Sequence, residues 1–325
     1  MLEARSWSWM FVVAAACGNP GETASPDGGG VDGVPALPEI TIPLDASPQA
    51  MHADDEAVYV WVGTELRRYP LSGGAHQVLV TGEYANELAR VGDQLFAVTS
   101  NKLVTVKTDG SGRATLHSGS QLGRGLAASA TRVYVPDGSS VVGMSWAGAN
   151  KTTRALEMPS ELLMAGSLLW VVQDYADYGY FDVRVYNESL TQQLAFTTAA
   201  GGVDGWLPES LASDGTKVYA ADSSGPIDLV VNEMAARPQT SGDQLVKTRL
   251  GDLPLGGNGP RMAADARDLY MLTGGGVYRY DRASAAFVAL VEGSVASSEL
   301  ALNEQYVFWV EEDGVRGVPR AGGAR

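Results

Sequence analysis

The sequence is poor in the residues that form covalent crosslinks and metal sites: its 325 residues include one cysteine and three histidines. A single cysteine excludes an intramolecular disulfide in any compartment. The histidines, His52, His76 and His117, are not spaced as metal ligands usually are. We therefore expect no metal site, and nothing in the sequence indicates another cofactor.

Catalytic and phosphate-binding motifs are also missing. No Gly-Xaa-Ser-Xaa-Gly segment, the turn that carries the nucleophile of many hydrolases, is present. Residues 256–259 and 274–276 are glycine-rich, but neither the lysine nor the helix of a phosphate-binding loop follows them. We interpret both segments as turns.

Basic residues are scarce, with 23 Lys and Arg against 38 Asp and Glu and a net charge of −15. Because like charges repel the phosphate backbone, this composition disfavours a nucleic-acid partner. A cationic or neutral partner fits the charge better. The alternative is that the acidity serves only solubility.

The N-terminus carries one short apolar run, residues 7–16 (WSWMFVVAAA), which ends at Cys17 and is followed by GNPGETASPDGGGVDGVPAL. The run is too short to span a bilayer as a helix. The segment Ala14-Ala15-Ala16-Cys17 resembles the lipobox of bacterial lipoproteins, with Ala14 where such boxes usually carry leucine. The resemblance implies a signal segment over residues 1–16 and lipidation of Cys17. The alternative is that Cys17 is incidental, in an ordinary cleaved signal or in an apolar N-terminal strand.

The residues after the cysteine predict a flexible tether and a cellular location. Residues 17–38 hold mostly small and turn-forming residues, which cannot recover the entropy of ordering. Gly18 is not the aspartate that resembles an inner-membrane retention signal. The resemblance therefore implies an outer-membrane lipoprotein that faces the periplasm or the cell surface.

From residue 51 onward one pattern recurs seven times. Each copy contains an aliphatic residue followed by an aromatic one, and a Leu or Met stands eight residues before the aromatic. The aromatics are Tyr59, Phe96, Tyr134, Trp170, Tyr219, Tyr270 and Phe308. The preceding Leu or Met residues are Met51, Leu88, Leu126, Leu162, Leu211, Met262 and Leu300. We expect the aromatics to fill the core rather than to stack on a ligand.

The repeat has the length and pattern of a propeller blade. Successive aromatics are separated by 37, 38, 36, 49, 51 and 38 residues. Each copy shows alternating runs separated by glycine-bearing turns, which predicts four strands, a to d. The fold class is therefore all-β, a seven-bladed β-propeller of four-stranded blades over residues 39–325.

The two ends of the repeat region complement each other. The last copy stops at the turn after its third strand, so its fourth strand is missing. Residues 39–44 (EITIPL) precede Met51 as QVLVTG precedes Leu88. We predict that this N-terminal strand completes the last blade, which removes two free sheet edges.

The pattern resembles the broad superfamily of NHL-like, TolB-like and WD40-like propellers, especially those of secreted bacterial lipoproteins. It lacks the Gly-His and Trp-Asp pairs of WD40 repeats, the kelch double glycine and the sialidase Asp-box. The resemblance implies that the d-to-a and b-to-c loops lie on one face of the ring, usually the binding face.

Two groups of residues are candidates for that face. Glu87, Glu161 and Glu299 directly precede the Leu of strand a in blades 2, 4 and 7. Glu209 lies one residue earlier in blade 5, and Arg261 holds the same place in blade 6. They predict either a site for a cation or basic peptide, or a solvated acidic rim.

Blade 4 supplies the second group, in two segments that exceed the basic repeat: the b-to-c loop 174–180 and the exit segment 197–209. They hold Tyr175, Tyr178, Tyr180, Asp204 and Trp206. Such residues suit recognition loops; the alternative is that the loops pack on each other. The blade 5 insertion, residues 232–244, is predicted as a flap in the c-to-d turn on the opposite face.

These observations favour an envelope-anchored, non-catalytic binding or scaffold lipoprotein with a protein or glycan partner. One alternative is a hydrolase or lyase that uses carboxylates at the axial mouth. Another is a purely structural component of an envelope complex. Three glutamates within coordinating distance of one another would favour metal binding or catalysis, and an aromatic blade 4 patch would favour a partner.

The substitution Cys17→Ser tests the predicted lipid anchor. Acyl chains contribute about 0.8 kcal/mol per buried CH₂, so the wild-type protein should stay in the membrane fraction after a salt wash. The variant should appear in the soluble fraction on immunoblots. Equal membrane partitioning of the two proteins would contradict lipidation at this residue.

Overall fold

The computed structural model describes residues 37–325 except 124, 176–179, 200–207, 224–227, 239, 242–243, 246, 255–259, 294–298 and 321–325. Residues Leu37–Arg325 form one compact unit. The predicted signal segment, Cys17 and nearly all of the tether lie outside the described residues. Within the described part, no helix is long and apolar enough to cross a membrane.

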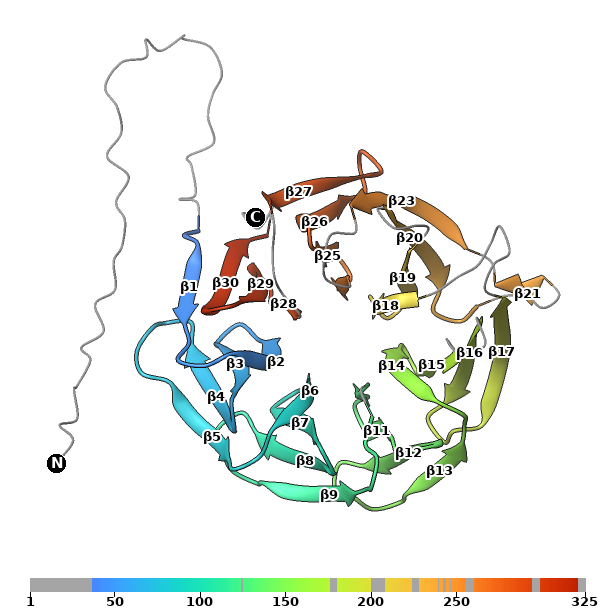
Figure 1. The fold of residues 1–325 in the computed structure, drawn as a ribbon, viewed down its shortest axis with the longest axis horizontal. Coiled ribbons are helices and arrows are strands. Elements are labelled where there is room, and N and C mark those ends of the chain that lie inside the picture. The colour runs from blue at the N-terminus through green and yellow to red at the C-terminus, as the bar shows by residue number, and fades with distance from the viewer. Residues whose placement is uncertain are drawn as a thin grey trace, which may run out of the picture. The chain divides into compact units, whose positions relative to one another are not determined.

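The alternating runs form seven four-stranded antiparallel sheets arranged in a ring around a central axis (Figure 1). The predicted seven-bladed β-propeller is confirmed. The innermost strand of each blade contacts the innermost strand of the next, in the order β2, β6, β10, β14, β18, β24, β28 and back to β2. The ring is thereby closed.

The blades are numbered along the chain, and their strands run from the axis outward as a, b, c and d. Blade 1 consists of β2(Pro48–Ala53), β3(Ala57–Val62), β4(Glu65–Pro70) and β5(Gln77–Thr81). Blade 2 consists of β6(Ala85–Val91), β7(Gln94–Thr99), β8(Lys102–Lys107) and β9(Ala114–Ser118). Blade 3 consists of β10(Ala127–Ala128), β11(Arg132–Pro136), β12(Ser140–Ser145) and β13(Thr152–Ala155). Blade 4 consists of β14(Pro159–Ala165), β15(Leu168–Tyr175), β16(Tyr180–Asn187) and β17(Gln192–Ala199).

The remaining blades follow the same order. Blade 5 consists of β18(Pro208–Ser213), β19(Lys217–Ser223), β20(Asp228–Ala235) and β23(Thr248–Pro254). Its c-to-d connection holds a small hairpin, β21(Thr240–Ser241) and β22(Gln244–Leu245). Blade 6 consists of β24(Arg261–Ala264), β25(Leu269–Thr273), β26(Gly276–Asp281) and β27(Ala286–Glu292). Blade 7 consists of β28(Leu300–Leu302), β29(Tyr306–Glu311), β30(Gly314–Pro319) and β1(Ile40–Pro43).

The N-terminal strand β1 pairs antiparallel with β30, with Ile40 opposite Gly317 and Pro43 opposite Gly314. Ile40 packs against the cluster of Phe308 and Val315. Gly317 is required there, because a Cβ would lie 2.6 Å from the Phe308 ring. The outermost strand of blade 7 thus comes from the opposite end of the chain to the other three.

The aliphatic-aromatic step on strand b packs each blade against both neighbours. Successive residues of a strand point to opposite faces of the sheet. The aromatic of one blade therefore lies in the same hydrophobic cluster as the aliphatic residue of the next blade. The pairs are Tyr59 with Leu95, Phe96 with Val133, Tyr134 with Leu169, Trp170 with Val218, Tyr219 with Leu269, Tyr270 with Val307 and Phe308 with Val58. All seven aromatics are buried, which confirms their predicted core role.

Two kinds of turn join strands a and b. In five blades the residue five positions before the aromatic accepts hydrogen bonds from two backbone N–H groups of the turn. These residues are Asp54, Ser129, Asp214, Asp265 and Asn303. Blades 2 and 4 instead carry Gly92 and Gly166, with φ of 61° and 60°, a region that favours glycine. Each blade therefore has a local signal that turns strand a back into strand b.

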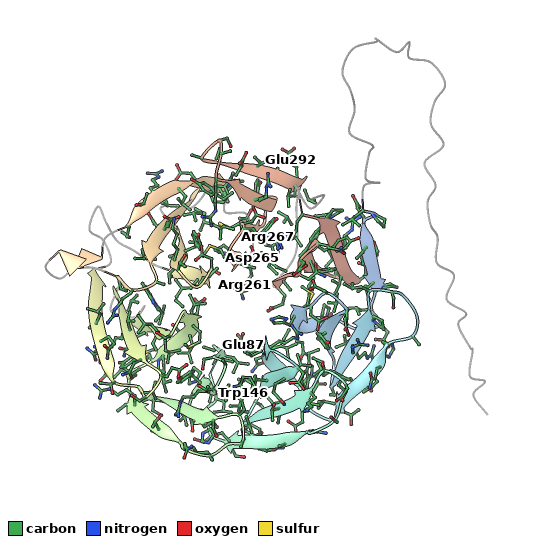
Figure 2. The ribbon with its side chains drawn as sticks, turned by 180° about the vertical axis from the view of Figure 1, so that it is seen from behind. Glu87, Trp146, Arg261, Asp265, Arg267 and Glu292 are labelled. Atoms are coloured by element: carbon green, nitrogen blue, oxygen red, sulfur yellow. The ribbon has the colours of Figure 1, made fainter. Side chains whose placement is uncertain are left out.

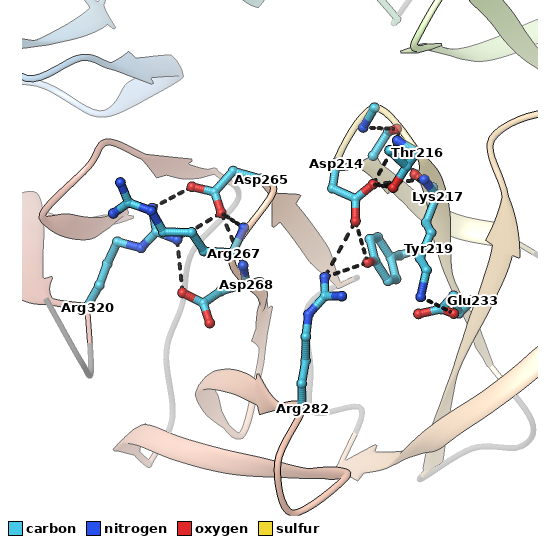
Figure 3. Close-up of polar contacts among 12 residues, drawn as sticks. Asp214, Thr216, Lys217, Tyr219, Glu233, Asp265, Arg267, Asp268, Arg282 and Arg320 are labelled. Atoms are coloured by element: carbon cyan, nitrogen blue, oxygen red, sulfur yellow. Dashed lines mark hydrogen bonds and ion pairs between the residues drawn. The ribbon is translucent and has the colours of Figure 1, made fainter.

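The same aspartates clamp neighbouring blades together through a tyrosine and an arginine (Figure 3). The Tyr219 hydroxyl donates to Asp214 at 2.8 Å, and Arg282 of blade 6 donates to the Tyr219 oxygen at 2.9 Å. Burial alone would raise the pKa of Asp214, but hydrogen bonds from Tyr219 and Thr216 outweigh it and lower the pKa to about 2. Asp214 is therefore ionised at neutral pH and holds both partners.

The clamp between blades 6 and 7 is the most buried. Arg320 follows β30, is 4% exposed, and donates to Asp265 at 2.6 and 2.9 Å, to Asp268 at 3.0 Å and to the Tyr270 hydroxyl at 3.1 Å. A third clamp joins blades 1 and 2, where Arg90 pairs with Asp54 at 3.1 Å. An aspartate–arginine clamp of this kind is thus present at three blade boundaries: 1–2, 5–6 and 6–7.

Three predicted loop segments are partly strand. One is the exit segment 197–209 of blade 4, since β17 ends at Ala199 and β18 begins at Pro208. In blade 4, β15 continues through Tyr175 and β16 begins at Tyr180, so the predicted loop 174–180 was placed too wide. In blade 5, Asn232 lies within β20, so the insertion begins after Ala235 rather than at residue 232. In blade 4 cross-strand pairing extends the sheet beyond the basic repeat, whereas in blade 5 Asn232–Ala235 pair with Lys217–Ala220 as part of the ordinary third strand.

Arg320→Ala should destabilise the propeller by about 3 kcal/mol, because removal of one member of a buried ion pair leaves carboxylates without their partner. Arg267→Ala is the matched control. Arg267 is exposed and lies beside the same carboxylates, so its loss should cost less than about 1 kcal/mol. Urea unfolding followed by tryptophan fluorescence measures both. Equal midpoints for the two variants would show that the clamp does not hold the ring.

Candidate functional site

The candidate site lies at the axis, on the face that carries the d-to-a and b-to-c connections, here called the upper face. Each blade places one residue there, directly before the Leu or Met of strand a. The seven residues, here called the axial ring, are Ala50, Glu87, Gly125, Glu161, Ser210, Arg261 and Glu299. Figure 2 shows Glu87 and Arg261 at the rim of the central opening, on opposite sides of it. The ring therefore carries ionisable groups from several blades to one mouth.

A repeated irregularity sets the start of strand a. The a–b pairing shifts register by one residue between Ala85 and Glu87, and between Pro159 and Glu161. Blades 1 and 5 show the same shift before Ala50 and Ser210. Such bulges bend a strand and redirect the side chains beside them. In these four blades the axial-ring residue thus stands directly after the bulge.

Glu161 ties two blades together at the mouth. Its Oε1 accepts a hydrogen bond of 2.9 Å from the backbone N–H of Leu211, in the innermost strand of blade 5. That N–H lies on the axial edge of the sheet, where no further strand can accept from it. The carboxyl group of Glu161 therefore replaces a strand neighbour and joins β14 to β18.

The environment of Glu161 favours its neutral form. Burial raises the pKa of Glu161 to about 7, although the Leu211 N–H and the charge of Arg261 act in the opposite direction. The negative charge of Glu87 raises it further. Since Arg261 and Glu87 both influence Glu161, blades 2, 4 and 6 are electrostatically coupled across the axial mouth.

The other two predicted carboxylates are Glu299 and Glu209. Glu299 is half-buried at its ring position and has interaction partners of its own. Glu209 lies in β18 at the point where the pairing with β19 shifts by one residue. Among the described residues, which include Glu87, Glu161 and Glu299, no three histidine, cysteine, aspartate or glutamate side chains are grouped to hold a metal ion.

The blade 4 hairpin extends above the basic repeat. In blade 1 the b–c pairing ends at Val62 opposite Glu65, three residues after the aromatic; in blade 4 it continues to Tyr175 opposite Tyr180, five residues after it. Two more residues per strand correspond to about 7 Å of sheet. The structure thus brings Tyr175 and Tyr180 opposite each other. Tyr178, Asp204 and Trp206 lie outside the described residues.

Two exposed apolar residues on the upper face were missed by the sequence analysis. Tyr84 is 60% exposed and Met158 is 51% exposed, and each directly precedes strand a of its blade. Each also stands three residues before an axial-ring glutamate. Met158 has a φ of 45°, a region that bulky residues rarely adopt. The only signal in the sequence is an apolar residue in a turn that the repeat does not require.

The histidines form no catalytic arrangement in the described part of the chain. Burial, with the charge of Arg90, lowers the pKa of His52 to about 4, so it is neutral at physiological pH. His117 in β9 lies 2.9 Å from Asp137 in the b-to-c connection of blade 3 and joins two blades. Neither residue belongs to the axial ring.

Glu161→Gln should change how stability depends on pH. Because the pKa of Glu161 is higher in the folded than in the unfolded protein, the folded state binds more protons between about pH 5 and 7, and stability falls as pH rises through that window. Glutamine keeps an oxygen for the Leu211 N–H and cannot ionise. The variant should equal wild type at pH 4 and exceed it by about 3 kcal/mol at pH 8.

Urea unfolding at a series of pH values measures this difference. Glu157→Gln, at an exposed position four residues earlier in the chain, is the control and should parallel wild type. Parallel curves for wild type and Glu161→Gln would contradict the assigned ionisation.

Comparison with known proteins identifies the architecture. No protein-family model and no curated protein sequence matches the chain. Solved structures do match, at low sequence identity. The WD40 domain of Pan2 from Neurospora crassa is similar with a TM-score of 0.57 and 10% identity, over 85% of this chain and 90% of that one.

Two bacterial structures are also similar. BamB from Moraxella catarrhalis matches with a TM-score of 0.55 and 14% identity, over 87% of this chain and 98% of that one. The extracellular domain of BT4673 from B. thetaiotaomicron matches with a TM-score of 0.60 and 13% identity, over 86% of this chain but only 39% of that one. At these identities the likeness shows a β-propeller fold that is shared with WD40 domains and BamB.

Proposed function

We propose that the protein is a non-catalytic binding or scaffold propeller of the bacterial cell envelope, anchored through Cys17, that holds a protein partner on its upper face. The blade 4 hairpin carries this proposal. Its strands continue beyond the length that blade packing requires, and the added residues include Tyr175 and Tyr180. Tyrosine-rich segments on a rigid scaffold are typical of recognition surfaces.

The predicted location rests on the N-terminal sequence and on the similar structures. The apolar run that ends at Cys17 supports export and lipidation. BamB and the BT4673 extracellular domain are bacterial propellers of comparable fold, the second one extracellular by its description. We propose an outer-membrane location on these grounds.

The alternative function, a hydrolase or lyase with carboxylates at the axial mouth, has less support. Its best feature is Glu161, since a carboxyl group with a pKa near 7 suits a general acid. That group is engaged with the Leu211 N–H of the neighbouring blade, which gives it a structural role. No described histidine lies in the axial ring to assist it.

Substitution of Tyr175, Tyr178, Tyr180 and Trp206 by alanine tests the binding surface. Tagged wild-type and variant proteins would be purified from cross-linked, detergent-solubilised envelopes, and the co-purifying proteins quantified by mass spectrometry. A partner bound by these anchors should fall at least tenfold, since a few aromatic residues carry most of the affinity of an interface.

The matched control replaces Asp93 and Lys151, two exposed residues on the opposite face, by alanine. Capture by this control should equal wild type. Thermal unfolding of the aromatic variant separates recognition from packing, because core aromatics cost about 3 kcal/mol or more when truncated. Undiminished capture by the aromatic variant would refute blade 4 as the binding centre.

A further inference from the structure

The upper face of blades 2 and 4 carries a repeated arrangement. In each blade an exposed apolar side chain, Tyr84 or Met158, stands directly before strand a, and a glutamate of the axial ring follows three residues later. The described residues include two other exposed large hydrophobics, Val78 and Val288, and both lie in outermost strands, β5 and β27. Within the described part, large exposed apolar side chains outside the outermost strands are therefore confined to these two d-to-a connections.

Both exposed side chains lie in segments that hydrogen bonds hold in place. Before Tyr84, Glu83 is held by Lys102 at 3.0 Å, and its carbonyl accepts from the Trp61 indole at 2.9 Å. Before Met158, the carbonyl of Glu157 accepts from Gln173 at 2.6 Å. The backbone of Met158 is held at positive φ, a strain that persists only where its surroundings impose it. Hydrogen bonds therefore hold the residue directly before each of these side chains.

Blade 3, which lies between these two blades, contributes no comparable side chain. At the position equivalent to Tyr84 and Met158, Leu122 is turned inward and buried. Gly125 replaces the ring glutamate, and a Cβ there would lie 3.2 to 3.3 Å from the backbone of residues 160–162. The two exposed apolar residues thus lie on blades separated by one blade, and each precedes its axial-ring glutamate by three residues.

We propose that this surface, Tyr84 and Met158 with Glu87 and Glu161, binds an extended polypeptide segment of the partner in which apolar residues alternate with lysine or arginine. The proposal rests on the proposed function and names the chemistry of its partner. Tyr84 and Met158 cover the apolar side chains. Glu87 receives one basic side chain, and a second basic side chain placed beside Glu161 favours the ionised form of that carboxyl group. Charge complementarity favours a basic segment, since the chain carries a net charge of −15.

Fluorescein-labelled synthetic octapeptides provide the probes: four Lys-Leu repeats, four Lys-Ser repeats and four Glu-Leu repeats. Fluorescence anisotropy should give saturable binding of the Lys-Leu peptide, at least tenfold weaker binding of Lys-Ser, and none of Glu-Leu. This order separates the proposed surface from general attraction of cations to an acidic protein, which Lys-Ser would share. Equal affinity for Lys-Leu and Lys-Ser would overturn the proposal, as would no saturation below about 1 mM.

Two double variants locate the binding. Tyr84→Ser with Met158→Ser should weaken Lys-Leu binding at least tenfold, whereas Val78→Ser with Val288→Ser removes two exposed apolar groups elsewhere and should change it less than twofold. Glu87→Gln with Glu161→Gln should weaken binding and reduce its dependence on salt. Equal losses in the two serine variants would refute the assignment.

The outcome can be separated from that of the proposed function. If the blade 4 alanine variant loses its envelope partner while the Tyr84 and Met158 variant retains it, the upper-face function stands and the basic-segment surface is wrong. If both variants retain the partner, the proposed function itself fails.

Discussion

Each blade of this protein is a sheet with two apolar faces and no layer of its own to cover them, so only neighbouring blades can remove those faces from water. The aliphatic-aromatic step on strand b meets this constraint, because adjacent residues of one strand face opposite neighbours. Seven such steps give seven clusters, each shared by two blades. The ring, the closing strand and the position of the axial mouth all depend on this shared burial.

The same constraint explains how much of the fold could be predicted. Burial must be repeated in every blade, so the spacing of aromatics such as Tyr59 and Phe96 recurs in the sequence and predicts the number and length of the blades. The tyrosine clamps were missed, although Asp54 and Asp214 stand at a fixed five residues before an aromatic. Their arginines come from unrelated positions, Arg90 in strand a and Arg282 in a c-to-d turn, so no spacing connects them.

The candidate site was predictable only in part. The sequence places Glu87 and Glu161 at the same position of the repeat, and the structure puts both in the axial ring. The sequence does not distinguish the two glutamates, because the ionisation of Glu161 depends on its burial and on an N–H group that blade 5 presents to it. Exposure of Tyr84 and Met158 is equally hidden, since Leu122 at the equivalent position is buried. Local sequence fixes position, whereas the neighbouring blade fixes environment.

The pairing of β1 with β30 has a mechanical consequence. The first strand of the described residues is also the outermost strand of blade 7, held by four residue pairs from Ile40 to Pro43. Tension applied through the N-terminal segment would therefore load the β1–β30 pairing, here called the seam, before any other sheet of the ring. For a protein attached at that end, the seam would set the force at which the ring opens, and a partner that bridges blades 7 and 1 would reinforce it.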